Sequence, residues 1–214
     1  MARCTKEQAL ETRGHILDAA EDVFHAKGVS NTSLADVAAA AGLTRGAIYW
    51  HFTNKGDLFE AMCQRVRLPM ETVIEATADE STSDPLGQLR EAGRFVLRQA
   101  VENPHHRKVL TILSHKCEFV DASDPIVIQR QQWLDHGQLN LERILTNAQA
   151  RGQVPADLDL RLAALMLHVT FDGLLHLWLF APHSFDLIAD AEKILEASIN
   201  CLRSNSDSLH RKPG

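Results

Sequence analysis

Two short helices joined by a tight turn, over residues 33–55, constrain the fold more than any other part of this sequence. Ser33 is a candidate N-cap of the first helix, and Asp36 stands three residues later, where an acidic side chain completes a capping box. Gly42 ends that helix, because glycine enters the left-handed conformation without steric cost. Thr44 then caps the next helix. This spacing is typical of a helix-turn-helix.

The second helix of the pair, predicted from Arg45 to about Phe52, carries side chains suited to DNA. Ile48 and Phe52 lie four residues apart and can face inward, so most of the residues between them project outward. In a helix-turn-helix this helix enters the major groove, where Arg45 can donate two parallel hydrogen bonds to a guanine, worth about 1–3 kcal/mol of discrimination. The predicted DNA-contacting residues are Thr44, Arg45, Gly46, Tyr49, Trp50, His51 and Lys55.

The phosphate backbone is the second predicted partner of this region. Tyr49, His51 and Lys55 can donate to phosphate oxygens, which positions a helix without reading sequence. A net charge of −6 does not by itself favour nucleic acid, but no acidic residue stands between Val37 and Gly56, and the local surface matters more than the total. The alternative interpretation is a capped helical hairpin within a helical core, with a merely solvated arginine.

Three motifs stand in the first 65 residues: T-R-x-x-I-L-D-A-A at 12–20, F-x-x-x-G-V at 24–29 and T-R-G-A-I-Y-W-H-F-x-N-K at 44–55. Together they resemble the DNA-binding domain of TetR-family transcriptional repressors. The resemblance implies a three-helix DNA-binding domain, a helical ligand-binding domain and a homodimer on double-stranded operator DNA. It also implies that Arg45 and Tyr49 approach bases, while Tyr49, His51 and Lys55 hold the backbone.

The composition favours an all-α protein of the cytoplasm. Of the 214 residues, 45% are hydrophobic but only 6% are aromatic, and the abundant alanine and leucine favour helix over sheet. The cysteines are scattered, which is typical of reduced thiols. The polar N-terminus does not resemble a secretory signal, and we find no uncharged apolar stretch of about 18 residues, so no membrane span is expected.

Caps, prolines and apolar periodicity predict about nine helices, arranged as an N-terminal three-helix DNA-binding domain and a C-terminal helical domain for ligand binding and dimerisation. The predicted domains are residues 1–65 and 66–204, followed by a disordered tail at 205–214. Pro69 predicts a kink or break in the fourth helix. Besides the two helices of the helix-turn-helix, the expected helices cover about 9–26, 54 to beyond 66, 85–102, 105–120, 125–151, 159–180 and 185–202.

The last two predicted helices are the most apolar part of the chain. Residues 160–180 are almost all hydrophobic, and a helix that is apolar all round must be covered on both sides. The final helix presents Leu187, Ala191 and Leu195 on one side. We therefore expect these two helices to form a four-helix interface with their symmetry mates in a two-fold homodimer.

The C-terminal half carries H-K-C-E-F at 115–119, D-P-L at 84–86 and W-L-F-A-P-x-S-F-D-L at 178–187. These segments resemble the AcrR- and TtgR-like branch of the family, which represses multidrug efflux pump operons. The resemblance implies a large, mostly apolar pocket in the helical domain. It also implies hydrophobic, drug-like inducers that bind there and release the DNA.

A pocket for such compounds needs apolar walls with a few polar groups. His168 and Asp172 are four residues apart on a helix, so they can face one cavity or bond to each other. Gly93 and Gly137 leave space within helices. The alternatives are simple core packing and, for Asp172, the dimer interface. The predicted ligand-binding residues are Leu89, Val96, Leu110, Leu113, Ser114, Trp133, Leu134, Leu141, His168, Phe171, Asp172 and His176.

Two other functions compete with this interpretation. Eleven histidines, with His105-His106 and with His115 close to Cys117 and Glu118, raise the alternative of a metal- or redox-sensing regulator on the same scaffold. Positions 115 and 117 point in different directions on a helix, which weakens that site. An enzyme is not supported, because the sequence holds no phosphate-binding glycine loop, H-E-x-x-H or G-x-S-x-G. No metal or cofactor is predicted.

Overall fold

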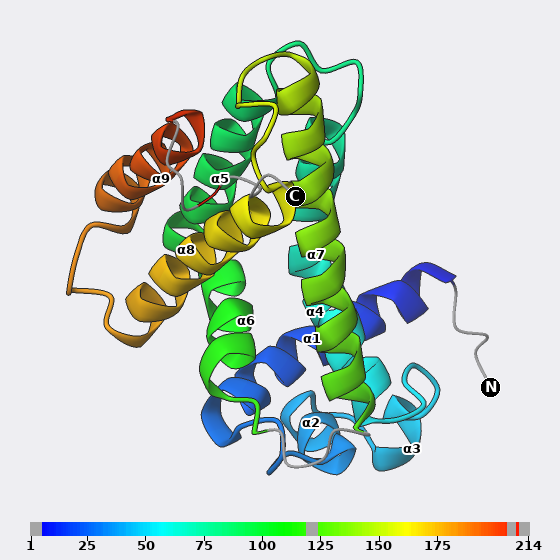
Figure 1. Ribbon diagram of the computed structural model, residues 1–214. Helices are drawn as coiled ribbons and strands as arrows, with labels where there is room; N and C mark the ends of the chain where they lie inside the picture. The colour runs from blue at the N-terminus through cyan, green and yellow to red at the C-terminus, as the bar shows by residue number, and fades with distance from the viewer. Residues whose placement is uncertain (1–5, 119–123, 205–208, 210–214) are drawn as a thin grey trace. The chain divides into compact units, whose positions relative to one another are not determined.

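The computed structural model describes residues 6–118, 124–204 and 209, and over these residues its elements are α-helices joined by loops (Figure 1). The all-α prediction is therefore confirmed, and the described part contains nine helices, as expected. Their bounds are α1 Lys6–Lys27, α2 Leu34–Ala40, α3 Arg45–Ile48, α4 Lys55–Thr77, α5 Pro85–Glu102, α6 Pro104–His115, α7 Pro125–Ala150, α8 Leu160–Phe180 and α9 Leu187–Arg203.

The chain folds into two compact units that are not contiguous in sequence. The first unit comprises Met1–Arg67 and Pro104–Gln129, and the second comprises Leu68–Asn103 and Arg130–Gly214. Helix α6 thus packs with the N-terminal helices, whereas the sequence suggests a single boundary after residue 65. The chain crosses between the units within α4, at the start of α6 and within α7.

The first unit is built on an aromatic core. Ile16 and Phe24 of α1 are fully buried, and the ring of Phe24 meets the ring of Phe59 from α4 edge to face, with 6.0 Å between centroids. Ile48 and Phe52 are also buried, at 0% and 1% exposure. The two residues predicted to turn inward from the second helix of the helix-turn-helix therefore do so.

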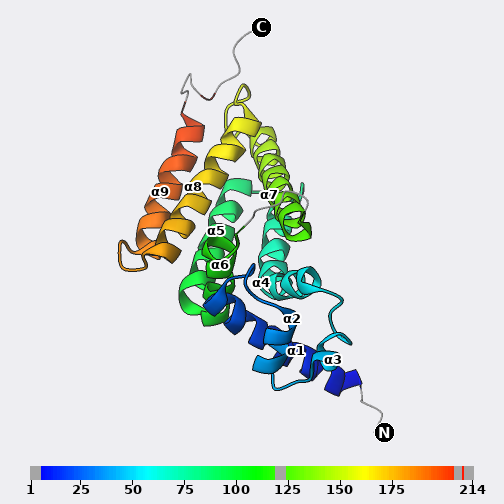
Figure 2. The same cartoon turned by 90° about the horizontal axis from the view of Figure 1, so that it is seen from below.

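The second unit is held by apolar packing and by a pair of salt bridges. Its core includes Leu86 of α5, Leu145 of α7 and Leu167 of α8. Helices α8 and α9 lie side by side in both views (Figures 1 and 2). Arg90 of α5 binds Glu196 of α9 at 2.7 Å, and one turn along the same helices Arg94 binds Glu192.

Two helix ends differ from the sequence expectation. Pro69 does not end α4, which continues to Thr77; the proline is exposed, so the carbonyl that loses its helical donor can bind water. Helix α6 ends at His115, short of the expected residue 120, because the next carbonyls bond elsewhere. The Lys116 carbonyl accepts from the N–H of Val29 at 2.9 Å.

The predicted disordered tail lies largely outside the described residues. Leu209, which is described, does not fit that expectation: its carbonyl accepts the N–H of Asp159 at 2.9 Å, and it packs against the core of the second unit. The predicted break at 121–124 likewise falls mainly on residues that the structure does not describe.

Helix α8 has the length and composition of a membrane-spanning helix, contrary to our expectation from the sequence. It nevertheless buries Ala163, Ala164, Leu167, Leu175, Trp178 and Leu179 within the second unit. It also carries His168, Asp172 and His176. These features fit a helix shared between a protein core and a protein interface better than a lipid environment.

Candidate DNA-binding and ligand-binding sites

The predicted capping box fixes the start of α2, the first helix of the helix-turn-helix. The Ser33 hydroxyl accepts the N–H of Asp36 at 3.2 Å, and the Asp36 carboxylate accepts the N–H of Ser33 at 2.9 Å. Lys27 of α1 binds the same carboxylate at 2.7 Å. Hydrogen bonds from Lys27 and Ser33 hold the pKa of Asp36 well below its usual range. α2 is thereby anchored to the end of α1.

The turn between α2 and α3 depends on Gly42, whose φ of +66° lies in the left-handed region. The N–H groups of Gly42 and Leu43 close the turn on the carbonyls of Ala39 and Ala38. Thr44 then caps α3, because its hydroxyl accepts the N–H of Ala47 at 3.2 Å. Each of these features follows the sequence prediction.

The second helix is shorter than expected. It is α-helical only over Arg45–Ile48 and continues as a tighter turn, in which the N–H groups of Trp50 and His51 bond to the carbonyls three residues back. This turn exposes Trp50 (90% exposed) and Tyr49 (49% exposed) beside buried Ile48.

Arg45 and Gly46 are also exposed, and a Cβ at Gly46 would meet no atom closer than 4.0 Å. Together with Tyr49 and Trp50 they form an open surface, which we call the reader surface. Its Arg45 guanidinium and Tyr49 hydroxyl are hydrogen-bond donors, and Gly46 leaves open space beside them.

Lys55 is engaged within the first unit. Its Nζ donates to the carbonyl oxygens of Val29 at 2.8 Å and Ser30 at 3.3 Å. An ammonium group has three N–H donors, so these bonds leave one donor for a phosphate oxygen. The side chain therefore ties the turn after α1 to the start of α4.

The predicted ligand-binding residues are not all on one buried surface. Most belong to the second unit, while Leu110, Leu113 and Ser114 belong to the first. In the second unit Val96 is buried, and Leu89 and Leu141 pack partly buried against the core. The side chains of Trp133, His168 and Phe171 are half-buried, whereas those of Leu134, Asp172 and His176 are exposed.

His168 and Asp172 do pair, with 3.4 Å between Nε2 and Oδ2. The hydrogen bond to Asp172, opposed by burial, raises the pKa of His168. The two glycines pack against the side chains of Phe171 and His168 at ordinary van der Waals distances, which does not test the space predicted for them. A Cβ at Gly137 would lie 3.4 Å from the His168 ring, and a Cβ at Gly93 would lie 3.7 Å from the ring of Phe171.

One face of α8 is exposed along its whole length. Leu165, Val169 and Phe180 are 42%, 62% and 76% exposed, and Asp172 and His176 fall on the same face at helical spacing. This face, which we call the α8 stripe, favours the interface interpretation for Asp172 and His176 over the pocket interpretation.

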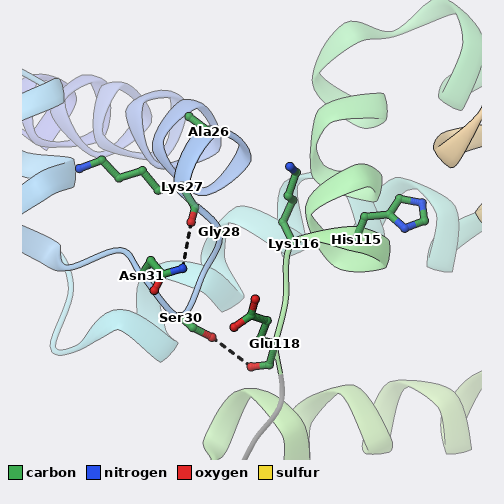
Figure 3. Close-up of a pocket in the computed structure, with 8 residues that line it drawn as sticks. All are labelled: Ala26, Lys27, Gly28, Ser30, Asn31, His115, Lys116 and Glu118. Carbon is green, nitrogen blue, oxygen red and sulfur yellow. Dashed lines mark hydrogen bonds between the residues drawn. The ribbon is translucent and has the colours of Figure 1, made fainter.

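A surface hollow of about 230 Å³ lies in the first unit, between the ends of α1 and α6 (Figure 3). The Ser30 hydroxyl crosses it to the carbonyl of Glu118 at 3.0 Å. None of the predicted ligand-binding residues lines it, and its polar lining does not suit a hydrophobic compound. Its lining residues are Ala26, Lys27, Gly28, Ser30, Asn31, His115, Lys116 and Glu118.

Of the histidines singled out in the sequence, His105 joins a cluster with metal-ligand spacing among the described residues. The single cluster there with metal-ligand spacing joins His105 to Asp18 and Glu21. The guanidinium of Arg65 already lies 2.7 Å from Asp18 and 3.3 Å from Glu21. A cation is thus supplied to these carboxylates by the protein itself.

Comparison with known families gives two matches along the chain. Residues 16–62 match the model of the tetR family of bacterial regulatory proteins, and residues 84–204 match that of the C-terminal region of MAATS-type transcriptional repressors. The chain therefore belongs to the TetR family of transcriptional regulators. The match covers the reader surface and the whole of α5, α8 and α9.

Individual relatives give a more specific comparison than the family models. The transcriptional regulator TtgR of Pseudomonas putida is 41% identical over 203 residues, which are 95% of this chain and 97% of TtgR. The regulator AcrR of Shigella flexneri is 41% identical over 192 residues, 89% of each chain.

The crystal structure of NalD, the secondary repressor of the MexAB-OprM multidrug efflux pump in Pseudomonas aeruginosa, superposes with a TM-score of 0.83 at 36% identity, covering 94% of this chain and 100% of NalD. The SmeT–triclosan complex gives 0.83 at 32% identity, covering 95% of this chain and 99% of SmeT.

Proposed function

We propose that this protein is a ligand-responsive repressor that binds a palindromic operator as a homodimer in the cytoplasm and is released by a hydrophobic, drug-like inducer. The regulated genes would encode a multidrug efflux pump. The observation that carries this proposal is the reader surface, where Arg45, Tyr49 and Trp50 are exposed around a buried Ile48. Relatives that repress efflux pumps match this chain over more than nine-tenths of its length.

The DNA contacts follow from the residue types on the reader surface. Arg45 supplies a bidentate donor for a guanine edge, and Tyr49 and His51 supply donors for phosphate oxygens. Thr44 begins α3, Gly46 permits close approach of the backbone, and Lys55 adds a charge beside a phosphate. Because one subunit offers few cations, we expect a modest dependence of affinity on salt.

The homodimer supplies the second reading helix, and the α8 stripe is the surface we assign to it. Leu165, Val169 and Phe180 give it exposed apolar side chains over several turns, with Asp172 and His176 between them. A two-fold axis through this stripe would pair it with itself, as an isologous interface requires. Two copies of α3 would then meet two half-sites of the operator.

Release by an inducer requires that the compound bind one conformation more tightly than the other. We assign the apolar walls of the inducer site to the second unit, with Val96, Trp133 and Phe171 among them, and its polar group to His168. The relative SmeT is known in complex with triclosan, so triclosan and hydrophobic antibiotics are the compounds to test first.

A fluorescence-anisotropy titration on the DNA upstream of the protein's own gene tests the assignment of the reader surface. We expect tight binding by the wild type and a loss of at least about tenfold in Arg45→Ala, from the removed guanine contact. Arg143→Ala, an exposed arginine of α7 in the second unit, is the matched control and should bind like the wild type. Equal affinity for all three proteins would refute the assignment.

A further inference from the structure

A single buried carboxylate joins three helices of the first unit. Glu21 of α1 is only 2% exposed, although a glutamate is rarely buried unless it is paired. Its Oε1 lies 3.3 Å from Nη1 of Arg65 in α4, and its Oε2 lies 2.9 Å from Nδ1 of His105 in α6. The two carboxylate oxygens therefore face two different helices.

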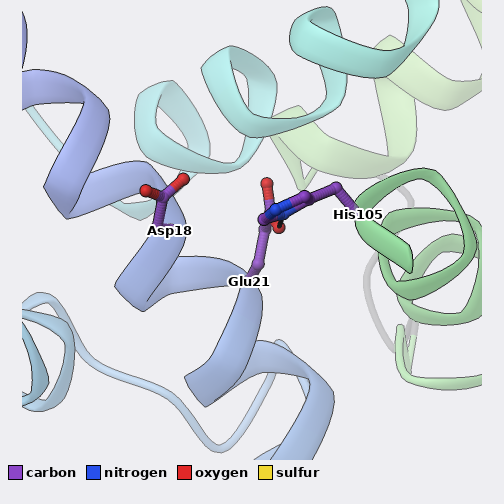
Figure 4. Close-up of side chains that lie close together, drawn as sticks. All are labelled: Asp18, Glu21 and His105. Carbon is purple, nitrogen blue, oxygen red and sulfur yellow. Dashed lines mark hydrogen bonds and ion pairs between the residues drawn. The ribbon is translucent and has the colours of Figure 1, made fainter. Parts of the chain in front are cut away.

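Neighbouring charges extend this arrangement. Asp18, one turn earlier on α1, shares the Arg65 guanidinium at 2.7 Å. Figure 4 shows Asp18 and Glu21 projecting from α1, with the His105 ring reaching Glu21 from the first turn of α6. Asp22, on the next position of α1, binds Lys108 of α6 at 2.5 Å. We call Asp18, Glu21, Arg65 and His105 the Glu21 network.

Both partners of Glu21, Arg65 and His105, stand close to points where the chain passes between the two units. Arg65 stands two residues before the chain leaves the first unit at Arg67, and His105 is the second residue after it returns at Pro104. The segment between these crossings, Leu68–Asn103, belongs wholly to the second unit. The buried carboxylate of Glu21 on α1 thus binds a residue shortly before this segment and a residue shortly after it.

We propose that Glu21 is a positioning residue that couples inducer binding in the second unit to operator affinity, an inference that rests on the proposed function. A change in the second unit can reach the reader surface only through the chain crossings and the packing around them. Glu21 fixes two crossings to α1, and α1 carries Lys27, which anchors α2 through Asp36. Without the carboxylate charge, Arg65 of α4 and His105 of α6 lose the partner on α1 that they share, while the Asp18–Arg65 and Asp22–Lys108 ion pairs remain.

Glu21→Gln is the sharpest variant, because it keeps the size of the side chain and removes its charge. Glu60→Gln is the matched control: Glu60 also lies in the first unit, on α4, but its hydrogen bond comes from Gln64 of the same helix. His105→Asn, at a mostly exposed position, cuts one connection only and serves if Glu21→Gln does not fold.

The measurement is the coupling ratio, defined as the operator Kd at a saturating concentration of compound divided by the operator Kd without compound. The compound is triclosan or a hydrophobic antibiotic that releases the wild-type protein from the operator. Thermal stability is recorded alongside. We expect this ratio to fall about fivefold or more in Glu21→Gln, and less in His105→Asn, while the Glu60→Gln ratio matches that of the wild type. A merely structural role would lower thermal stability and both affinities together, leaving the ratio unchanged.

A second readout needs no inducer. Operator binding should slow hydrogen exchange in α5 and α7 of the wild type, and this protection should be reduced in Glu21→Gln, since coupling between sites is reciprocal. An unchanged ratio and unchanged protection in a folded variant overturn the role of Glu21 alone. A wild type that binds no operator overturns the proposed function instead.

Discussion

The Nζ of Lys55 lies 2.8 Å from the carbonyl oxygen of Val29, across 26 positions of sequence. A residue predicted to contact DNA therefore also holds the turn between α1 and α2 against the start of α4. The same turn donates the Val29 N–H to the carbonyl of Lys116, after α6. Stability and operator affinity are consequently linked at this lysine.

Replacement of Lys55 by glutamine should affect both properties. The loss of charge-assisted bonds to two carbonyls should lower the free energy of unfolding by about 1–2 kcal/mol in urea denaturation. If the third donor reaches a phosphate, the slope of log affinity against log salt should also fall by about one per subunit. An unchanged slope would leave Lys55 a structural residue only. Lys193→Gln, at an exposed position of α9, is the control.

Alanine substitutions at Trp50 and Phe52 should distinguish effects on operator affinity from effects on stability. Trp50 is 90% exposed and Phe52 is 1% exposed, so Trp50→Ala should change the unfolding free energy by less than about 0.5 kcal/mol, while Phe52→Ala should cost about 3–5 kcal/mol. Trp50→Ala should nevertheless weaken operator binding severalfold. Full operator affinity in Trp50→Ala would remove this side chain from the reader surface.

A charge on the α8 stripe should dissociate the dimer. Phe180 is 76% exposed in the single chain, and an aspartate buried there against its symmetry mate would be an unpaired charge. Sedimentation of Phe180→Asp should show monomers at micromolar concentrations, where the wild type is dimeric. Leu10→Asp, at a residue of α1 that is 61% exposed, should remain dimeric. A dimeric Phe180→Asp would place the interface elsewhere.

The His168–Asp172 pair should make stability depend on pH. The hydrogen bond to Asp172 raises the pKa of His168. A raised folded pKa gives stabilisation that is complete below the unfolded value of about 6.5 and is lost as the pH rises through the folded pKa. The free energy of unfolding of the wild type should therefore exceed that of Asp172→Asn by about 0.5 kcal/mol near pH 5.5, and by less near pH 8.5. The difference is small because Asp172 is 56% exposed.

Asp190→Asn is the control for that experiment, because Asp190 pairs with a lysine, Lys193, and not with a histidine. Its effect on unfolding should be independent of pH. If the effect of Asp172→Asn on unfolding is also independent of pH, the His168–Asp172 pair does not titrate as inferred.

Local features of the fold were predictable because their causes are local. The capping box of Ser33 and Asp36, the turn at Gly42 and the buried faces of Ile48 and Phe52 each depend on residues within a few positions of one another. The family resemblance added the arrangement of the reader surface around them.

Other features depend on contacts that no short window contains. Helix α6 stops at His115 because the Lys116 carbonyl turns to Val29, and the ion pairs of Glu21 join residues 44 and 84 positions apart. Asp172 and His176 suited a pocket by residue type and periodicity, but the direction in which α8 faces is set by its packing against α9 and α7. Periodicity gives a face of a helix, and tertiary packing decides what that face meets.

The central claim is that one compound lowers the affinity of this protein for its operator, and a single titration tests it most directly. Labelled operator bound to the wild-type dimer is followed by anisotropy as triclosan or a hydrophobic antibiotic is added, with calorimetry confirming that the compound binds. We predict that the operator Kd rises at least about fivefold at saturation. An operator affinity that stays constant while these compounds bind the protein would contradict the account.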